Sequence, residues 1–367
     1  KDSKQLTVFF KGIAILLVIL VHSHQKFDIL PLFRAVPRFG QMGCQIFFVL
    51  SSFGLCHSFL KNQPNWLSHM KKRISKLLVG YWGAIIIYAI YHMLIAIVFE
   101  KDILSTINIP GVFINMLFLN GIIPIETINN NIVRGGWYVG TLVVLYAIFP
   151  ILYNIYFADK NKIWRKYRMI LFPLIILCIT STIVITMGLI NPTFACKNNS
   201  FVYFSFINQL TPFSLGIVLF EFYNRKNVYK KTLLFSILSL VVSIILFYGN
   251  FKYSYVFCPT FVALSFVFLY KWFSNNQKIF NTINNSSNII IRTILCFGKN
   301  SFSIYLTHSF IVFEFSQICL TLLRQVYRND LLWYVVLLPI EYFLIYLVGS
   351  LYNKCISSIK IHHSKTN

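Results

Sequence analysis

The chain has 367 residues, of which 57% are hydrophobic and only 12% are charged, and its mean hydropathy is +0.68. A soluble domain of this size needs far more charge on its surface, so a soluble globular protein is excluded. Apolar runs long enough to cross a hydrocarbon core of roughly 30 Å recur along the whole length. The composition therefore predicts an all-α polytopic membrane protein, because a β-barrel would show short alternating segments instead.

Ten apolar segments are predicted to cross the membrane as one helical bundle, without a soluble domain. A shorter apolar piece near 111–125 contains Gly121 and Pro124, and it is predicted to be interfacial or re-entrant. The predicted spans are, in chain order, about 7–23, 42–60, 77–98, 137–157, 169–190, 201–222, 232–249, 253–273, 297–322 and 331–353. Together they make a single transmembrane domain over residues 1–367.

The net charge of +23 suggests a nucleic-acid ligand, but the distribution of this charge argues against one. If the N-terminus is cytoplasmic, most of the 33 basic residues fall on the cytoplasmic side, for example in 71–76 and 160–168. Such an excess of Lys and Arg sets the orientation of a membrane protein. Both termini are therefore predicted to lie in the cytoplasm, and the basic residues to contact anionic membrane lipids rather than nucleic acid.

Lys11 and His22 lie near opposite ends of the first span, in the stretch KGIAILLVILVH. The helical repeat brings them to one face, about 16 Å apart along the axis. An ionisable side chain within a span usually faces the bundle interior and has a function. The alternative is structural, with His22 hydrogen-bonded to a loop and Lys11 extended to the head groups. Helix geometry alone leaves both interpretations open.

Four further motifs follow the first span in order. They are GCQIFFVLSSFGL at 43–55, KKRISKLLVGYW at 71–82, GGWYVGTLVVLYAIFPIL at 135–152 and FGKNSFSIYLTHSFIVFEF at 297–315. With KGIA and the histidine of the first span, this series resembles the acyltransferase 3 family of integral membrane O-acyltransferases. Each motif alone is weakly specific for this family. The occurrence of all five in the family's order, from residue 11 to residue 308, is much more specific.

The resemblance implies roles for individual residues. His22 matches the family's essential histidine, and Lys11 stands where the family usually has Arg. Arg73 and Lys76 match the family's Arg-x-x-Arg, again with one Lys for Arg. The late motif of the family is matched here by Ser301, Tyr305 and His308.

Several positions depart from the family pattern. Lys in place of Arg at 11 and 76 keeps the charge but loses the planar fork that holds a phosphate bidentately. Ser52 replaces a Gly, Val79 replaces a Pro, and Gln45 stands where many members have an acidic residue. These differences concern how a donor is positioned.

The family implies transfer of an acyl group, often acetyl, from cytoplasmic acyl-CoA to a hydroxyl of a surface glycan or lipid-linked glycan. Arg73 and Lys76 share a helix face at the predicted start of the third span, and a helix N-terminus also favours anions. They are predicted to hold the nucleotide phosphates with Lys72 and Lys11, the alternative being an ordinary positive-inside cluster. His22 is predicted to be the general base that deprotonates the acceptor hydroxyl.

Further candidates lie on the second, fourth and ninth spans. Glu314, about 9 Å along the helix from His308, is the candidate to polarise His22, with a structural hydrogen bond between helices as the alternative. His308 and Tyr305 are expected near the bound donor, with helix packing as the alternative for His308. Aromatic residues at the start of the fourth span are routine at membrane interfaces, but they can also stack on a sugar. The predicted acceptor contacts are Trp137, Tyr138 and Gln45.

Two other functions stay open from the sequence. An exporter or flippase of a polysaccharide or lipid-linked glycan would use buried His, Glu and Lys as proton or substrate sites, although no inverted repeat is evident. A catalytically degenerate member could assist glycan assembly without turnover. The expected donor is acetyl-CoA and no metal is expected. The expected location is a bacterial cell membrane, and association into a homo-oligomer is left open.

Overall fold

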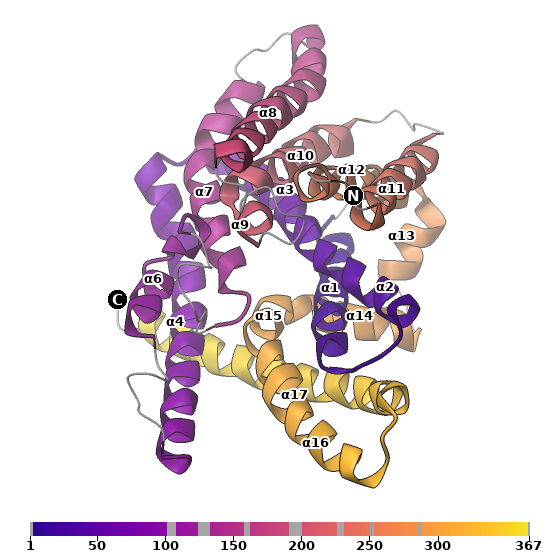
Figure 1. Cartoon of the computed structure of the whole chain (residues 1–367). Helices are drawn as coiled ribbons and strands as arrows, with labels where there is room; N and C mark the ends of the chain where they lie inside the picture. Colours follow the sequence, from indigo (N-terminus) through magenta and orange to yellow (C-terminus); the bar gives the residue numbers. More distant parts are fainter. Residues whose placement is uncertain are drawn as a thin grey trace.

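The computed structural model describes residues 3–100, 108–123, 133–157, 162–190, 200–225, 231–249, 251, 253–284 and 288–365. Helices make up nearly all of this part of the chain, which contains no strand (Figure 1). The predicted all-α fold class is therefore confirmed. The elements are α1 (Lys4–Ser23), η1 (His24–Lys26), α2 (Pro31–Phe39), η2 (Gly40–Met42), α3 (Gly43–Asn62), α4 (Trp66–Val98), α6 (Ile109–Met116), η3 (Leu119–Gly121), α7 (Gly136–Phe157), α8 (Lys162–Ile190), α9 (Ser200–Phe204), α10 (Phe206–Asn224), α11 (Thr232–Tyr248), α12 (Ser254–Asn275), α13 (Gln277–Asn284), α14 (Ile289–Lys299), α15 (Ser301–Phe310), the π-helical turn η6 (Ile311–Phe315), α16 (Ser316–Val326) and α17 (Asp330–Lys365).

Nine helical segments of the described residues are long and apolar enough to cross a membrane. They overlap nine of the ten predicted spans, and the remaining one, 232–249, is the shorter apolar helix α11. The chain is thus a multi-pass membrane protein. Its N-in, C-in orientation stays a prediction.

Two span boundaries differ from the prediction. Helix α4 begins at Trp66 instead of near residue 77, because Asn65 caps it by accepting a hydrogen bond from the Ser68 backbone N–H at 2.9 Å. The predicted span 297–322 is interrupted at Asn300, between α14 and α15, and it contains the turn η6. Both differences affect residues of the site.

Helix α1 occupies the centre of the bundle, where it contacts α3, α14, α15 and α17 (Figure 1). Two glycines permit its close approach to α14. A methyl group at Gly12 would overlap the carbonyl oxygen of Ile294, and one at Gly298 would overlap that of Val8. Small residues at such crossings let the two backbones come together, so this pair fixes the position of α1.

The predicted re-entrant piece folds as α6, of eight residues, and the turn η3. Eight residues rise only about 12 Å, too little to cross the membrane. The Tyr81 hydroxyl donates to Asn115 at 2.7 Å and accepts from Asn120 at 2.9 Å, and all three side chains are buried. These bonds anchor the segment against α4. Pro124 lies outside the described residues.

Candidate active site

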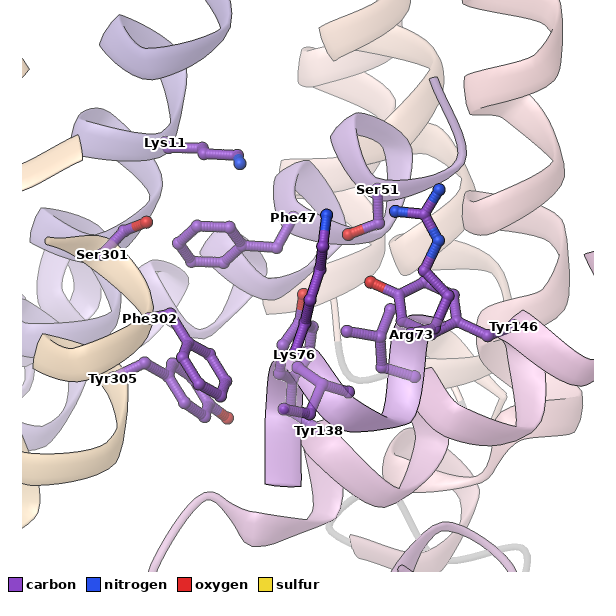
Figure 2. A pocket seen from close by; sticks show the side chains of 12 residues that line it. Lys11, Phe47, Ser51, Arg73, Lys76, Tyr138, Tyr146, Ser301, Phe302 and Tyr305 are labelled. Atoms are coloured by element: carbon purple, nitrogen blue, oxygen red, sulfur yellow. The ribbon is translucent and has the colours of Figure 1, made fainter. Parts of the chain in front are cut away.

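A cavity of about 250 Å³ lies between α1, α3, α4, α7 and α15 (Figure 2). It brings together side chains from all five motifs recognised in the sequence. Its walls are formed by Lys11, Phe47, Ser51, Arg73, Lys76, Leu77, Tyr138, Leu142, Tyr146, Ser301, Phe302 and Tyr305. We refer to it as the basic pocket.

Three basic side chains face this pocket. Lys11 comes from α1, and Arg73 and Lys76 come from neighbouring turns of α4, with their charged ends in the upper part of Figure 2. None of the described lining residues is acidic. The Arg73 Nε is buried without a hydrogen-bond partner among the described residues. A concentrated positive charge with an unused buried donor suits an anionic ligand.

The predicted contribution of a helix N-terminus to this site is wrong. Because α4 begins at Trp66, Arg73 lies two turns inside the helix, and Asn65 caps the true terminus. The field of a helix terminus falls off within the first turn. Lys72 is exposed and lies outside the lining, so the structure does not bring it together with Arg73 and Lys76.

The remaining walls of the basic pocket are largely aromatic. The rings of Tyr138 and Tyr305 lie 5.0 Å apart, and Phe47 lies 6.0 Å from Tyr138. The Tyr305 hydroxyl donates to the Gly135 carbonyl at 2.9 Å. Gly135 has φ +86°, and a side chain there would be strained and would press on Tyr305. This turn therefore fixes the wall formed by α7 and α15.

The two aromatic residues at the start of α7 have different surroundings. Tyr138 lines the basic pocket with the three cations. Trp137 is buried in the protein, stacked on Phe204 with ring centroids 4.4 Å apart. The structure thus places Tyr138 on the side expected for the donor, whereas Trp137 packs against α9 and lines no part of the basic pocket.

His22 lies outside the basic pocket, at the other end of α1. Its ring centroid is 5.2 Å from that of the buried His308 and 5.6 Å from that of Phe313. Its Nδ1 lies 3.4 Å from Gln25 Oε1. Tyr305 lines the pocket one turn before His308 on α15, so α1 and α15 both connect the pocket to this histidine pair.

Two other predicted residues are engaged elsewhere. Glu314 accepts a hydrogen bond from the Tyr91 hydroxyl at 2.9 Å, and the bond of His22 is to Gln25. Gln45 is fully buried and donates to Gln209 at 3.0 Å, linking α3 to α10. The structure does not bring Glu314 into hydrogen-bond contact with His22, and it does not place Gln45 on the basic pocket.

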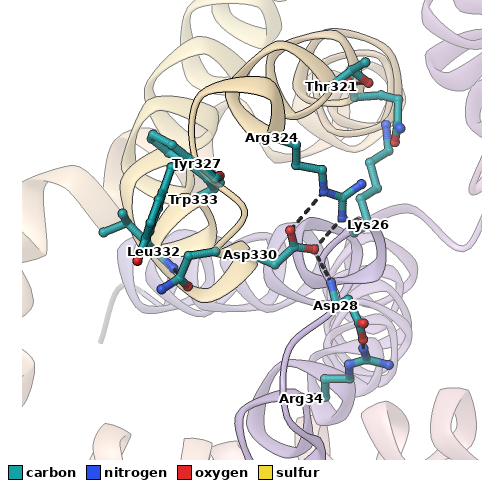
Figure 3. A network of polar contacts seen from close by, with 11 residues as sticks. Lys26, Asp28, Arg34, Thr321, Arg324, Tyr327, Asp330, Leu332 and Trp333 are labelled. Atoms are coloured by element: carbon teal, nitrogen blue, oxygen red, sulfur yellow. Dashed lines mark hydrogen bonds and ion pairs between the residues drawn. The ribbon is translucent and has the colours of Figure 1, made fainter.

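The segment that follows His22 is fastened to the ends of α16 and α17 (Figure 3). Asp330 accepts from the Arg324 Nε at 2.9 Å and from the Asp28 backbone N–H at 2.5 Å. Arg324 also donates to the Lys26 carbonyl at 3.3 Å, and the Lys26 amine donates to the Phe313 carbonyl. This network holds the segment that follows α1, and with it the end of α1 that carries His22, against η6, α16 and α17.

Several pocket residues were not predicted as site residues. Phe47 and Ser51 lie on one face of α3, and Tyr146 lies on α7 beyond Tyr138. The i, i+4 spacing of the first two was the available signal. Ser52, the noted departure from the family, instead donates to the Phe213 carbonyl and packs against Gly216 of α10. It has no direct part in the basic pocket.

The fold and this site define a multi-pass helical membrane protein with a basic, aromatic-walled pocket between its central helices. The acyltransferase 3 family, described as an acyltransferase domain, matches residues 9–352, nearly the whole chain. The chain therefore belongs to this family and is a membrane acyltransferase. No curated protein and no solved structure matches it significantly.

Proposed function

We propose that the protein transfers an acetyl or similar short acyl group from acyl-CoA to a hydroxyl of a cell-surface glycan or lipid-linked glycan. The observation that supports this most is the basic pocket, where Lys11, Arg73 and Lys76 converge and the described lining contains no acid. Acyl-CoA carries several phosphate charges, and Arg and Lys are the side chains that bind phosphate. The bacterial cell membrane is the proposed location.

The donor would lie along α1 and α15. Its nucleotide phosphates would contact the three cations, and Tyr138 and Tyr305 would border the thiol-bearing arm. Lys11 and His22 are about 16 Å apart along α1, which is comparable to the length of an extended pantetheine arm. A donor anchored in the basic pocket would thus present its thioester close to His22.

His22 would act as the general base. It takes the proton of the acceptor hydroxyl, and the oxygen attacks the carbonyl carbon of the thioester. The carbon–sulfur bond breaks, the sulfur leaves with the electron pair, and the proton passes from His22 to the thiolate to give free CoA. A histidine suits this task because its ordinary pKa lies near neutral pH. His22 is half-buried, and an acceptor hydroxyl would have to reach its exposed part.

The test uses the purified full chain in lipid nanodiscs with acetyl-CoA, with and without an extract of envelope glycans. Release of free CoA that requires the extract, with the acetyl label recovered on glycan, is the expected result. An absence of thioester consumption with any extract, in a protein that binds no acetyl-CoA, would overturn the proposal. Movement of unmodified glycan across the membrane would then favour an exporter.

A further inference from the structure

A second group of cations lies at the end of α1 that carries His22. The guanidinium carbon of Arg134 lies 3.9 Å from the centroid of the Phe313 ring, and the Lys26 amine lies 5.2 Å from it. The same ring contacts the His22 ring edge to face, with centroids 5.6 Å apart. The distances of 3.9 Å and 5.6 Å keep the Arg134 guanidinium within about 10 Å of the His22 ring. A disaccharide can cover such a distance.

The Arg134 side chain is available to a ligand. It is exposed, and it makes no hydrogen bond or ion pair within the described part of the chain. The cation–π contact with Phe313 holds the head group in place, but it provides no hydrogen-bond acceptor for the N–H donors of the guanidinium. A guanidinium is the group that binds a carboxylate or a phosphate bidentately.

The backbone turn that carries Arg134 is fixed on both sides. Val133 is fully buried, and its carbonyl accepts from the Gly136 backbone N–H at 2.9 Å. The carbonyl of Gly135 accepts from the Tyr305 hydroxyl at 2.9 Å. Binding costs less conformational entropy when the binding residue is already held in place. The turn therefore presents Arg134 at a defined position beside η6.

No acidic side chain forms an ion pair with Arg134 or Lys26 in the described part of the chain. Glu314, which follows Phe313 on the π-helical turn, accepts a hydrogen bond from the Tyr91 hydroxyl at 2.9 Å. The Lys26 amine donates to the Phe313 carbonyl, and an ammonium group has further N–H donors. Both cations can therefore contact a ligand without breaking an ion pair.

Membrane topology does not account for this charge. His22 and the basic pocket lie toward opposite ends of α1, and the predicted orientation places Arg134 and Lys26 on the outer side. The positive-inside bias explains basic residues on the cytoplasmic side alone. An anionic ligand beside His22 explains a fixed, exposed Arg134 at this end of the bundle.

We propose that Arg134 and Lys26 bind an anionic group of the acceptor, a carboxylate or a phosphate, and so place one of its hydroxyls at His22. The acceptor is then an acidic glycan or a glycan carried on a lipid phosphate, and not a neutral saccharide. This inference rests on the proposed function. The donor phosphates and the acceptor anion bind to separate groups of cations, so the two substrates do not compete for one site.

The test divides the extract of envelope glycans by anion exchange into a retained, anionic fraction and an unretained, neutral fraction. Each fraction is given with acetyl-CoA to the full chain in nanodiscs of zwitterionic lipid, and CoA release is measured. We expect wild type to turn over with the retained fraction. Arg134→Gln should raise the KM for this fraction about 30-fold, the size of one lost hydrogen bond to a charged group. The KM for acetyl-CoA should be unchanged.

Arg328→Gln is the matched control. Arg328 is exposed in the turn between α16 and α17, whose Asp330 binds the segment after α1, so the control removes the same charge at the same end of the bundle. We expect it to change the KM for the retained fraction by less than about twofold, as for a screened surface charge. Equal effects of the two substitutions would overturn the proposal, and so would turnover confined to the neutral fraction.

Two treatments of the retained fraction identify the anion. Reduction of its carboxyl groups should raise the KM if a carboxylate is bound, and removal of its phosphate groups should do so if a phosphate is bound. An unchanged KM after both treatments would overturn the proposal. Nanodiscs that contain anionic lipid test a lipid head group as the ligand. An effect of Arg134→Gln seen only in those nanodiscs would assign Arg134 to the lipid and overturn the proposal.

Failure of this inference is separable from failure of the proposed function. Turnover with the neutral fraction alone leaves acyl transfer standing and refutes only the anionic acceptor. If neither fraction supports the consumption of acetyl-CoA, the proposed function fails and the inference fails with it.

Discussion

Replacing Arg73 by Gln should weaken the binding of acetyl-CoA without destabilising the protein. Arg73 is half-buried, makes no ion pair among the described residues, and has a buried Nε without a partner. Removing it therefore breaks no ion pair within the described part of the chain, and it relieves the cost of a partly buried charge. A hydrogen bond to a charged group contributes about 2 kcal/mol, so loss of one phosphate contact should raise the Kd about 30-fold.

The assay is equilibrium binding of acetyl-CoA to the protein in nanodiscs at fixed salt. Lys71→Gln is the matched control, because Lys71 lies on the same helix, is exposed, and lies outside the basic pocket. Each substitution removes one positive charge from the same region of α4, but we expect the control to change the Kd by less than about twofold, as for a screened surface charge. Equal weakening by the two variants would refute the reasoning. It would mean that only the general field of the positive-inside cluster attracts the donor.

Two further predictions concern the scaffold of the site. Gly12→Ala should lower stability by about 1–3 kcal/mol, because the added methyl overlaps the Ile294 carbonyl and forces α1 from α14; the control Gly54→Ala meets open space and should be neutral or stabilising in thermal unfolding. A Gly12→Ala protein as stable as the control would contradict this packing. Asp330→Asn should lower the free energy of unfolding by about 1–2 kcal/mol. The substitution removes the negative charge that pairs with Arg324, and the Asp330 side chain is only 12% exposed. Hydrogen exchange should rise in 24–30 in this variant, and unchanged exchange there would show that the network does not hold this segment.

Much of the fold follows from local sequence patterns. Apolar runs predict nine of the spans because membrane helices satisfy their backbone hydrogen bonds internally and must be apolar over a fixed length. The helical repeat likewise predicts that Lys11 and His22 lie on one face of the same helix, near its two ends. The start of α4 could not be found this way, because its first turns are polar and extend beyond the apolar run that begins near Leu77.

The pairing of Glu314 with His22 shows where pattern reasoning stops. The helical rise from His308 gives the depth of Glu314, but six residues also turn it about 120° from the face of His308. The π-helical turn at Ile311–Phe315 changes the register further. The structure consequently directs Phe313 to His22 and Glu314 to Tyr91. The place of Tyr138 on the basic pocket likewise depends on how α4 and α7 pack, which no single segment encodes.

The central claim is that His22 removes the proton of the acceptor in acyl transfer. The most direct measurement compares CoA release by wild type and His22→Ala in nanodiscs, with glycan extract present and acetyl-CoA binding measured on the same samples. His57→Ala is the control, because His57 is half-buried on α3 and packs against Phe53 and Phe220, away from the site. The account predicts that His22→Ala binds acetyl-CoA normally but loses about 10²–10⁴-fold in turnover. Normal turnover by a folded His22→Ala protein would contradict it.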